Sequence, residues 1–262
     1  MKTEIYYFSG TANSLSVAQN LGKKLDNSKI ISIPRVINNA NYITGEIIGI
    51  VCPIHMHNMP HIVRDFIKKI KEVKYLFMVY TGAGKLGRGL KTTRKLFAAQ
   101  NLKLSSLFNI PMPDNSMIYG ETPEDKQKEM FNFADKKTED IVKIVKRKEE
   151  HFDSNNTSLF ETYIHPGIWC SLGYSHIKEM DKAYFTDENC NGCSICQKVC
   201  PVNNITMKNS KPVWNHNCQA CFACVDWCPK ASIQPNKKMA GIKRYHHPDI
   251  AVKEIIGSSA EV

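Results

Sequence analysis

Eight of the ten cysteines lie in two short stretches, and their spacing is the strongest chemical signal in this chain of 262 residues. The first stretch, CNGCSICQKVCP, covers residues 190–201, and the second, CQACFACVDWCP, covers residues 218–229. Both follow the pattern C-x2-C-x2-C-x3-C-P, and the second copy starts 28 residues after the first (218 − 190). An internal repeat of this kind predicts two copies of one small structural unit.

Clustered thiolates favour a metal centre over disulfides, because nothing else in the sequence points to secretion. Iron in an iron–sulfur cluster needs soft thiolate ligands, and two-residue gaps let three cysteines surround one cluster. The following C-P carries the fourth cysteine away from the first three. A pair of zinc sites is the alternative, although zinc modules usually combine two C-x2-C hooks that lie far apart in sequence.

The two stretches closely resemble a bacterial ferredoxin that carries two [4Fe–4S] clusters, and the resemblance covers residues 184–235. In such proteins the fourth cysteine of each copy binds the cluster of the other copy. The resemblance therefore implies one cluster on Cys190, Cys193, Cys196 and Cys228, and a second cluster on Cys218, Cys221, Cys224 and Cys200. Crossed ligation would tie the two halves together, so removing one cluster should loosen the other.

A second candidate site is the loop FSGTANS, residues 8–14, which follows an apolar strand and opens a helix. Backbone N–H groups at a helix N-terminus bind anions, and the hydroxyls of Ser9, Thr11 and Ser14 add donors. A plain helix cap is the alternative. No pattern for a nucleoside triphosphate or a dinucleotide is present.

This loop resembles the flavodoxin phosphate loop, with Ala12 in place of the usual glycine. The resemblance implies FMN at the carboxyl ends of parallel strands, where doubly wound sheets bind ligands. Its phosphate would bind Ser9, Gly10, Thr11, Ala12, Asn13 and Ser14. Its ring would lie between two further loops, formed by Pro53, Ile54, His55, Met56, His57 and Asn58 and by Thr81, Gly82, Ala83, Gly84, Lys85 and Gly87.

Two histidines are the candidate catalytic groups, since His55 and His57 could donate a proton to a reduced flavin or a bound substrate near neutral pH. The alternative is that they only complete hydrogen bonds in a polar loop. A metal site that also uses His61 is a weaker interpretation. Lys85 could stabilise an anionic reduced flavin or could point to water, and Cys52 and Cys170 are interpreted as structural thiols.

Residues 1–150 alternate strand and helix signals, which predicts a doubly wound α/β unit. Three short apolar runs suit parallel strands buried on both faces: residues 4–8, 46–51 and 75–80. Residues 29–33 and 103–110 are less regular candidates that would bring the number of strands to five. We expect a flavodoxin-like FMN-binding domain at 1–150, a linker with a short helix at 151–183, a small α+β ferredoxin domain at 184–235 and a basic tail at 236–262. Such tails are usually solvated, and docking to an acidic partner is the alternative.

The formal net charge of +10 would be partly balanced by two clusters and a phosphate. No nucleic-acid module is recognisable, and no apolar run is long enough for a membrane span or a signal peptide. We therefore expect a cytoplasmic protein that binds neither nucleic acid nor membrane.

The whole chain resembles the flavodoxin–ferredoxin fusion proteins of anaerobes. This resemblance implies an electron carrier that couples its clusters to FMN and exchanges electrons with a redox protein, either a ferredoxin or a reductase. The alternative is an FMN-dependent reductase of a small molecule, fed by its own clusters. A homodimer that exchanges the ferredoxin unit is a further expectation.

Overall fold

The computed structural model describes residues 2–82, 84, 86, 89–116, 121–153 and 173–260. Its first part alternates strands and helices. These elements are β1 (Thr3–Tyr7), α1 (Asn13–Lys24), β2 (Ser28–Ser32), α2 (Ile33–Val36), β3 (Ile43–Pro53), α3 (His61–Ile67), β4 (Ile70–Gly82), α4 (Gly89–Ala99), β5 (Ser106–Pro111), α5 (Glu124–Arg147) and β6 (His151–Phe152).

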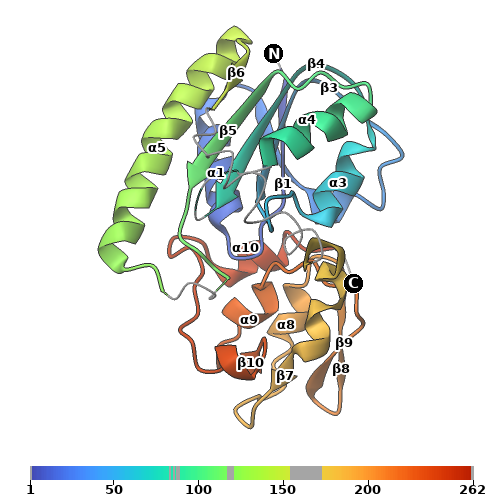
Figure 1. Cartoon of the computed structure of the whole chain (residues 1–262), viewed down its shortest axis with the longest axis vertical. Helices are drawn as coiled ribbons and strands as arrows, with labels where there is room; N and C mark the ends of the chain where they lie inside the picture. Colours follow the sequence, from blue (N-terminus) through green and yellow to red (C-terminus); the bar gives the residue numbers. More distant parts are fainter. Residues whose placement is uncertain are drawn as a thin grey trace.

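The strands form one parallel sheet in the order β2-β1-β3-β4-β5-β6. Helices α1 and α5 cover one face, and α3 and α4 cover the other (Figure 1). Both faces of the sheet are buried, which suits the apolar sequences of its strands. Ile5, Ile50 and Phe77, for example, are fully inaccessible to solvent. This is a flavodoxin-like doubly wound fold, whose strand order reverses between β1 and β3.

The second part is a small ferredoxin-like unit with two two-stranded antiparallel sheets. Figure 1 shows it below the large sheet, with α10 between the two. Its elements are η1 (Ile177–Ala183), β7 (Phe185–Thr186), α8 (Ile195–Lys198), β8 (Ile205–Lys208), β9 (Lys211–Trp214), α9 (Ala223–Asp226), β10 (Ile233–Gln234), η2 (Lys237–Met239) and α10 (Val252–Ile256).

The C-terminal segment returns to the first unit instead of extending into solvent. The Tyr245 hydroxyl donates to Asn13 Oδ1 at 2.7 Å, and the His247 backbone N–H donates to the Thr11 carbonyl at 2.9 Å. These two contacts hold the segment against the 9–14 loop.

The end of this segment is anchored in the large hydrophobic core. Ile250 and Ile255 are buried there. The Ser258 hydroxyl lies 2.5 Å from the Tyr7 hydroxyl. The backbone carbonyl of Ser258 accepts a hydrogen bond from the Ser32 hydroxyl. The expectation of a solvated tail is therefore wrong for these residues.

The predicted fold class is confirmed, with one difference in the sheet. We expected five strands, and the structure has six. The sixth, β6, pairs with β5 through Ser106 and Leu107 and lies at the start of the segment expected to be a linker. Among the described residues, no helix has the length and apolar character needed to cross a membrane.

Replacing the buried anchor of α10 tests the packing of the C-terminal segment. Ile255→Ala should lower the free energy of unfolding by about 2–5 kcal/mol, because it leaves a cavity in the core. The exposed neighbour Lys253→Ala should change it by less than about 0.5 kcal/mol. Urea unfolding measures both, and equal small effects would mean that the segment is not folded onto the sheet.

Candidate functional site

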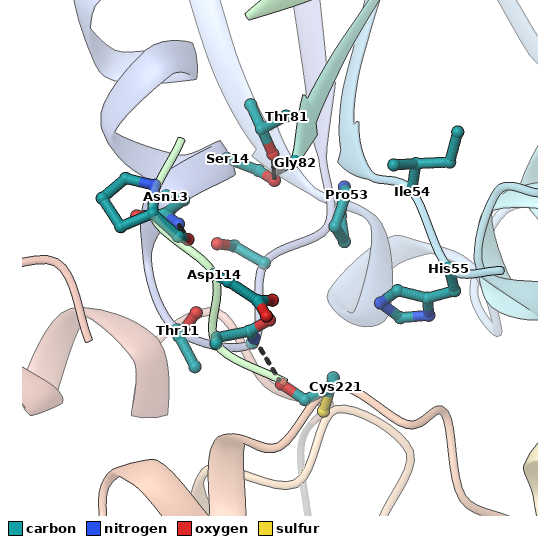
Figure 2. A pocket seen from close by; sticks show the side chains of 14 residues that line it. Thr11, Asn13, Ser14, Pro53, Ile54, His55, Thr81, Gly82, Asp114 and Cys221 are labelled. Carbon is teal, nitrogen blue, oxygen red and sulfur yellow. Dashed lines mark hydrogen bonds between the residues drawn. The ribbon is translucent and has the colours of Figure 1, made fainter. Parts of the chain in front are cut away.

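A pocket opens at the carboxyl edge of the parallel sheet, where the loops after β1, β3, β4 and β5 meet (Figure 2). The space between its walls is about 460 Å³ when the open solvent at its mouth is included. Its lining residues are Ser9, Gly10, Thr11, Asn13, Ser14, Pro53, Ile54, His55, Thr81, Gly82, Pro113, Asp114, Asn115 and Cys221.

The 9–14 loop forms the base of this pocket, at the N-terminus of the twelve-residue helix α1. Ala12 precedes the helix with a φ of 75°, in the left-handed region that glycine adopts with less strain. This conformation explains why glycine is usual in such loops. The helix dipole and the unpaired N–H groups of the first turn make the base of the pocket suitable for an anion.

Two polar side chains of the loop are already engaged within the protein. Asn13 Nδ2 donates to the Pro113 carbonyl at 3.0 Å, and the hydroxyls of Ser14 and Thr81 are 2.7 Å apart. Asn13 therefore bonds across to the loop after β5. Thr11 is buried at 3% exposure and lines the pocket.

His55 comes from the loop after β3 and points into the pocket (Figure 2). Its Nδ1 is buried and has no hydrogen-bond partner in the protein. Burial, and to a smaller extent the neighbouring His61, lowers the pKa of His55 to about 4. A neutral imidazole with an unpartnered buried nitrogen is suited to hydrogen-bond a polar ligand in the pocket.

A tight turn presents His55. The backbone of His55 pairs with that of Asn58, while Met56 and His57 adopt φ values of 47° and 59°. Two consecutive positive φ values define a type I′ turn, which costs energy for residues other than glycine. Strain of this kind often accompanies a functional loop.

The other predicted ring-contacting residues divide into three groups. Pro53, Ile54, Thr81 and Gly82 line the pocket. Met56, His57, Asn58 and Gly84 are not among the residues that line it. Ala83, Lys85 and Gly87 lie outside the described residues, as does Cys170.

Met56 and His61 instead contact the segment that leads into the ferredoxin-like unit. Met56 packs beside Tyr174 and Ile177. The His61 ring stacks on Tyr174 at 4.3 Å, and His61 Nε2 lies 3.1 Å from the Tyr174 carbonyl. His61 therefore connects the two units rather than facing the pocket.

The eight clustered cysteines surround two separate cavities. One cavity is lined by Cys190, Cys193, Cys196 and Cys228, which we call the outer set. The other is lined by Cys200, Cys218, Cys221 and Cys224, which we call the inner set. Each cavity thus brings together three cysteines of one sequence copy and the fourth cysteine of the other, the combination that crossed ligation requires.

Several sulfurs accept hydrogen bonds from the backbone, which is a feature of iron–sulfur sites. Asn204 N–H donates to Cys200 Sγ at 3.2 Å, and Ala220 N–H donates to Cys218 Sγ at 3.3 Å. In the outer set, Ser232 N–H donates to Cys228 Sγ at 3.4 Å. These donors would stabilise negative charge on the sulfurs.

Burial opposes that charge when no metal is bound. It raises the pKa of Cys196 to about 11 and that of Cys218 to about 12, and it raises the pKa of Cys224 well above its usual value. Loading iron would therefore release protons from these thiols. Among the described residues, no three His, Cys, Asp or Glu side chains converge closely enough for a single metal ion.

Cys221 joins the inner set to the pocket at the sheet edge. It lines both cavities, and its sulfur points away from the pocket towards the ferredoxin-like unit (Figure 2). Its carbonyl accepts a hydrogen bond from Asn115 Nδ2 at 3.4 Å. A Cβ on Gly10 would collide with this carbonyl, so the 9–14 loop and the cysteine repeat are in direct backbone contact.

Sequence reasoning missed this contact and the part of the pocket formed by Pro113, Asp114 and Asn115. These three residues follow the fifth strand, and that position was a signal that could have identified them. No local pattern could have placed Cys221 in the pocket, because its partner Gly10 lies more than 200 residues away in sequence.

Comparison with known proteins gives one family match. Residues 182–229 match the model described as a 4Fe–4S dicluster domain. No curated protein is similar enough to the chain to match it.

Two solved structures share a distant likeness with about half of the chain. A putative flavoprotein from Bacteroides uniformis ATCC 8492 is 15% identical, with a TM-score of 0.33, and the match covers 50% of this chain and 97% of that chain. The Trp repressor binding protein from Bacillus subtilis is 13% identical, with a TM-score of 0.30, and the match covers 52% of this chain and 98% of that chain. Likenesses this distant do not identify the ligand of the pocket.

The environment of His55 can be tested by a histidine NMR titration of protein stripped of any bound ligand. We expect His55 to stay neutral at about pH 5 and to titrate near 4, whereas an exposed imidazole titrates near about 6.5. The unfolded chain would bind this proton at higher pH than the folded chain does. His55 should therefore make the free energy of unfolding fall as the pH drops from about 6.5 to 4.

The His55→Gln variant is the matched control, and it should lose this part of the pH dependence. A His55 midpoint near 6.5 would contradict the burial described above.

Proposed function

We propose that this protein transfers electrons between two [4Fe–4S] clusters and an FMN bound at the sheet edge. The clusters would occupy the inner and outer sets of cysteines. When bound, FMN can hold one or two electrons, whereas each cluster passes one at a time. One chain would therefore couple one-electron carriers to a flavin.

One observation carries the proposal: Cys221 belongs both to the inner set and to the wall of the pocket. A cofactor in the pocket and a cofactor in the inner set would be separated from each other by little more than this one residue. Because electron-transfer rates fall steeply with distance, such a shared wall favours direct transfer inside the chain. Fusion also replaces collision between two proteins with a high effective concentration.

Two features of the pocket support FMN as its ligand. The phosphate would bind at the N-terminus of α1, where N–H groups and the Thr11 hydroxyl can donate to it. The buried and unpartnered Nδ1 of His55 would then gain a hydrogen-bond partner on the flavin. The Cys221 backbone and its neighbours would shield the ligand from water on the ferredoxin-like side.

An electron carrier is better supported than a reductase of a small molecule. A reductase needs a proton donor, but burial lowers the pKa of His55 to about 4, so its imidazole is neutral at pH 7. His57 is not among the residues that line the pocket. We therefore propose that the external partner is another redox protein, such as a ferredoxin or a reductase.

Anaerobic reconstitution tests the proposal at its base. Iron, sulfide and flavin assays should give two four-iron clusters and one FMN per chain. The EPR spectrum of the reduced protein should show two interacting clusters. A protein that binds zinc in place of iron, or that takes up no flavin, would overturn the proposal.

A single hydroxyl in the loop offers a sharper test of the phosphate site. Thr11→Val keeps the shape of the side chain but removes a donor to a charged group, which is worth about 1.5–3 kcal/mol. We expect the dissociation constant for FMN to rise roughly 10- to 100-fold. Thr44→Val, the same change at an exposed position on β3, should leave it unchanged.

Fluorescence titration of the flavin-free protein measures both constants. Equal affinities in the two variants would rule out the Thr11 hydroxyl as a phosphate ligand.

A further inference from the structure

The two thiol sets lie at different depths relative to the sheet edge. In the inner set, Cys200 and Cys221 are buried, and Cys221 reaches the pocket. In the outer set, Cys196 is buried as well, but Cys193 is exposed to solvent. The residues that line the outer cavity all lie between positions 190 and 233, and none of them lines the pocket at the sheet edge.

Three contacts hold the inner set against the sheet. Gln219 follows Cys218 in the sequence, and its side chain is buried. Its Oε1 accepts a hydrogen bond at 3.0 Å from the backbone N–H of Ile62, near the start of α3. Asn115 donates to the Cys221 carbonyl. The first contact links the second cysteine stretch to α3, and the second links it to the loop after β5, which lines the pocket.

The third contact is the backbone approach at Gly10. No side chain fits there, because a Cβ would overlap the Cys221 carbonyl. Trp227 Nε1 donates to the Gly10 carbonyl at 2.9 Å and holds the two segments together. A glycine at this position thus brings the inner set as close to the 9–14 loop as the backbone allows.

The outer set is directed towards solvent instead. Lys211, on the exposed β8–β9 hairpin, donates to the Cys190 carbonyl at 3.1 Å. Lys230 is exposed and lines the outer cavity. This side of the ferredoxin-like unit is accessible to another macromolecule, while the inner side is covered by the sheet edge.

We propose that the inner set is the flavin's electron-transfer partner and that the outer set exchanges electrons with the external redox protein. This order rests on the proposed function. One electron leaves the cluster on the inner set and is gained by the flavin, and no bond is formed or broken. The inner cluster then regains one electron from the outer cluster. Gly10 and Cys221 are positioning residues that set the distance of the inner transfer.

The test makes one cluster at a time paramagnetic, by removing one of its cysteine ligands. Cys218→Ala in the inner set and Cys190→Ala in the outer set remove the first cysteine of each sequence copy, and both residues are partly exposed. Loss of one thiolate ligand commonly leaves a three-iron cluster, which is paramagnetic when oxidised. Intact oxidised four-iron clusters have no net spin in their ground state and oxidised FMN is diamagnetic, so the altered cluster contributes most of the broadening of nearby NMR signals.

The readout is the ³¹P line of bound FMN in each oxidised holoprotein, with EPR confirming the three-iron cluster. We expect a line several-fold broader in Cys218→Ala than in Cys190→Ala. Equal broadening, or the opposite order, would overturn the assignment.

A second measurement covers the case in which a variant loses its cluster completely. The flavin fluorescence lifetime should lengthen when the inner cluster is lost and stay near the wild-type value when the outer cluster is lost, and the reverse result would sink the proposal. Absence of an FMN signal in the wild-type protein would instead refute the proposed function, which keeps the two failures distinct.

Discussion

The backbone contact between Gly10 and Cys221 is the constraint on which the rest of the arrangement depends. It joins the first loop of the large sheet to the second cysteine stretch with no side chain between them. The sheet presents its loops at one edge because all of its strands are parallel, and the ferredoxin-like unit covers that edge. A ligand in the pocket would therefore be enclosed by both units, and neither unit alone forms the complete wall.

The C-terminal segment adds contacts between the large sheet and the ferredoxin-like unit. After the cysteine repeat it crosses the 9–14 loop through Tyr245 and His247 and ends in the core of the large sheet at Ile255. The ferredoxin-like unit is thus attached to the sheet at both of its ends, by the segment that contains Tyr174 and by the C-terminal segment. Such a double attachment would favour a fixed distance between the pocket and the inner set, which the proposed electron transfer requires.

Much of the fold could be predicted because its signals are local. Apolar runs indicate buried parallel strands, and the fixed gaps between cysteines indicate two similar thiol sites, whose crossed composition the ferredoxin resemblance implied. The features that the sequence did not predict depend on contacts between residues far apart in the chain. A two-residue strand such as β6 has no periodicity of its own, and the two isoleucines that anchor the tail, Ile250 and Ile255, stand in a short, charged stretch. The orphaned nitrogen of His55 depends on burial, which a sequence does not show.

The central claim is that electrons pass inside one chain, and the most direct test is the rate of that passage. Flavin in the oxidised holoprotein would be photoreduced by a short flash, and the redistribution of electrons between flavin and clusters would be followed by visible absorption. We predict a first-order rate that does not change as the protein is diluted. A rate that falls in proportion to protein concentration would show that transfer requires collision between chains, and it would contradict the shared wall at Cys221 as the route.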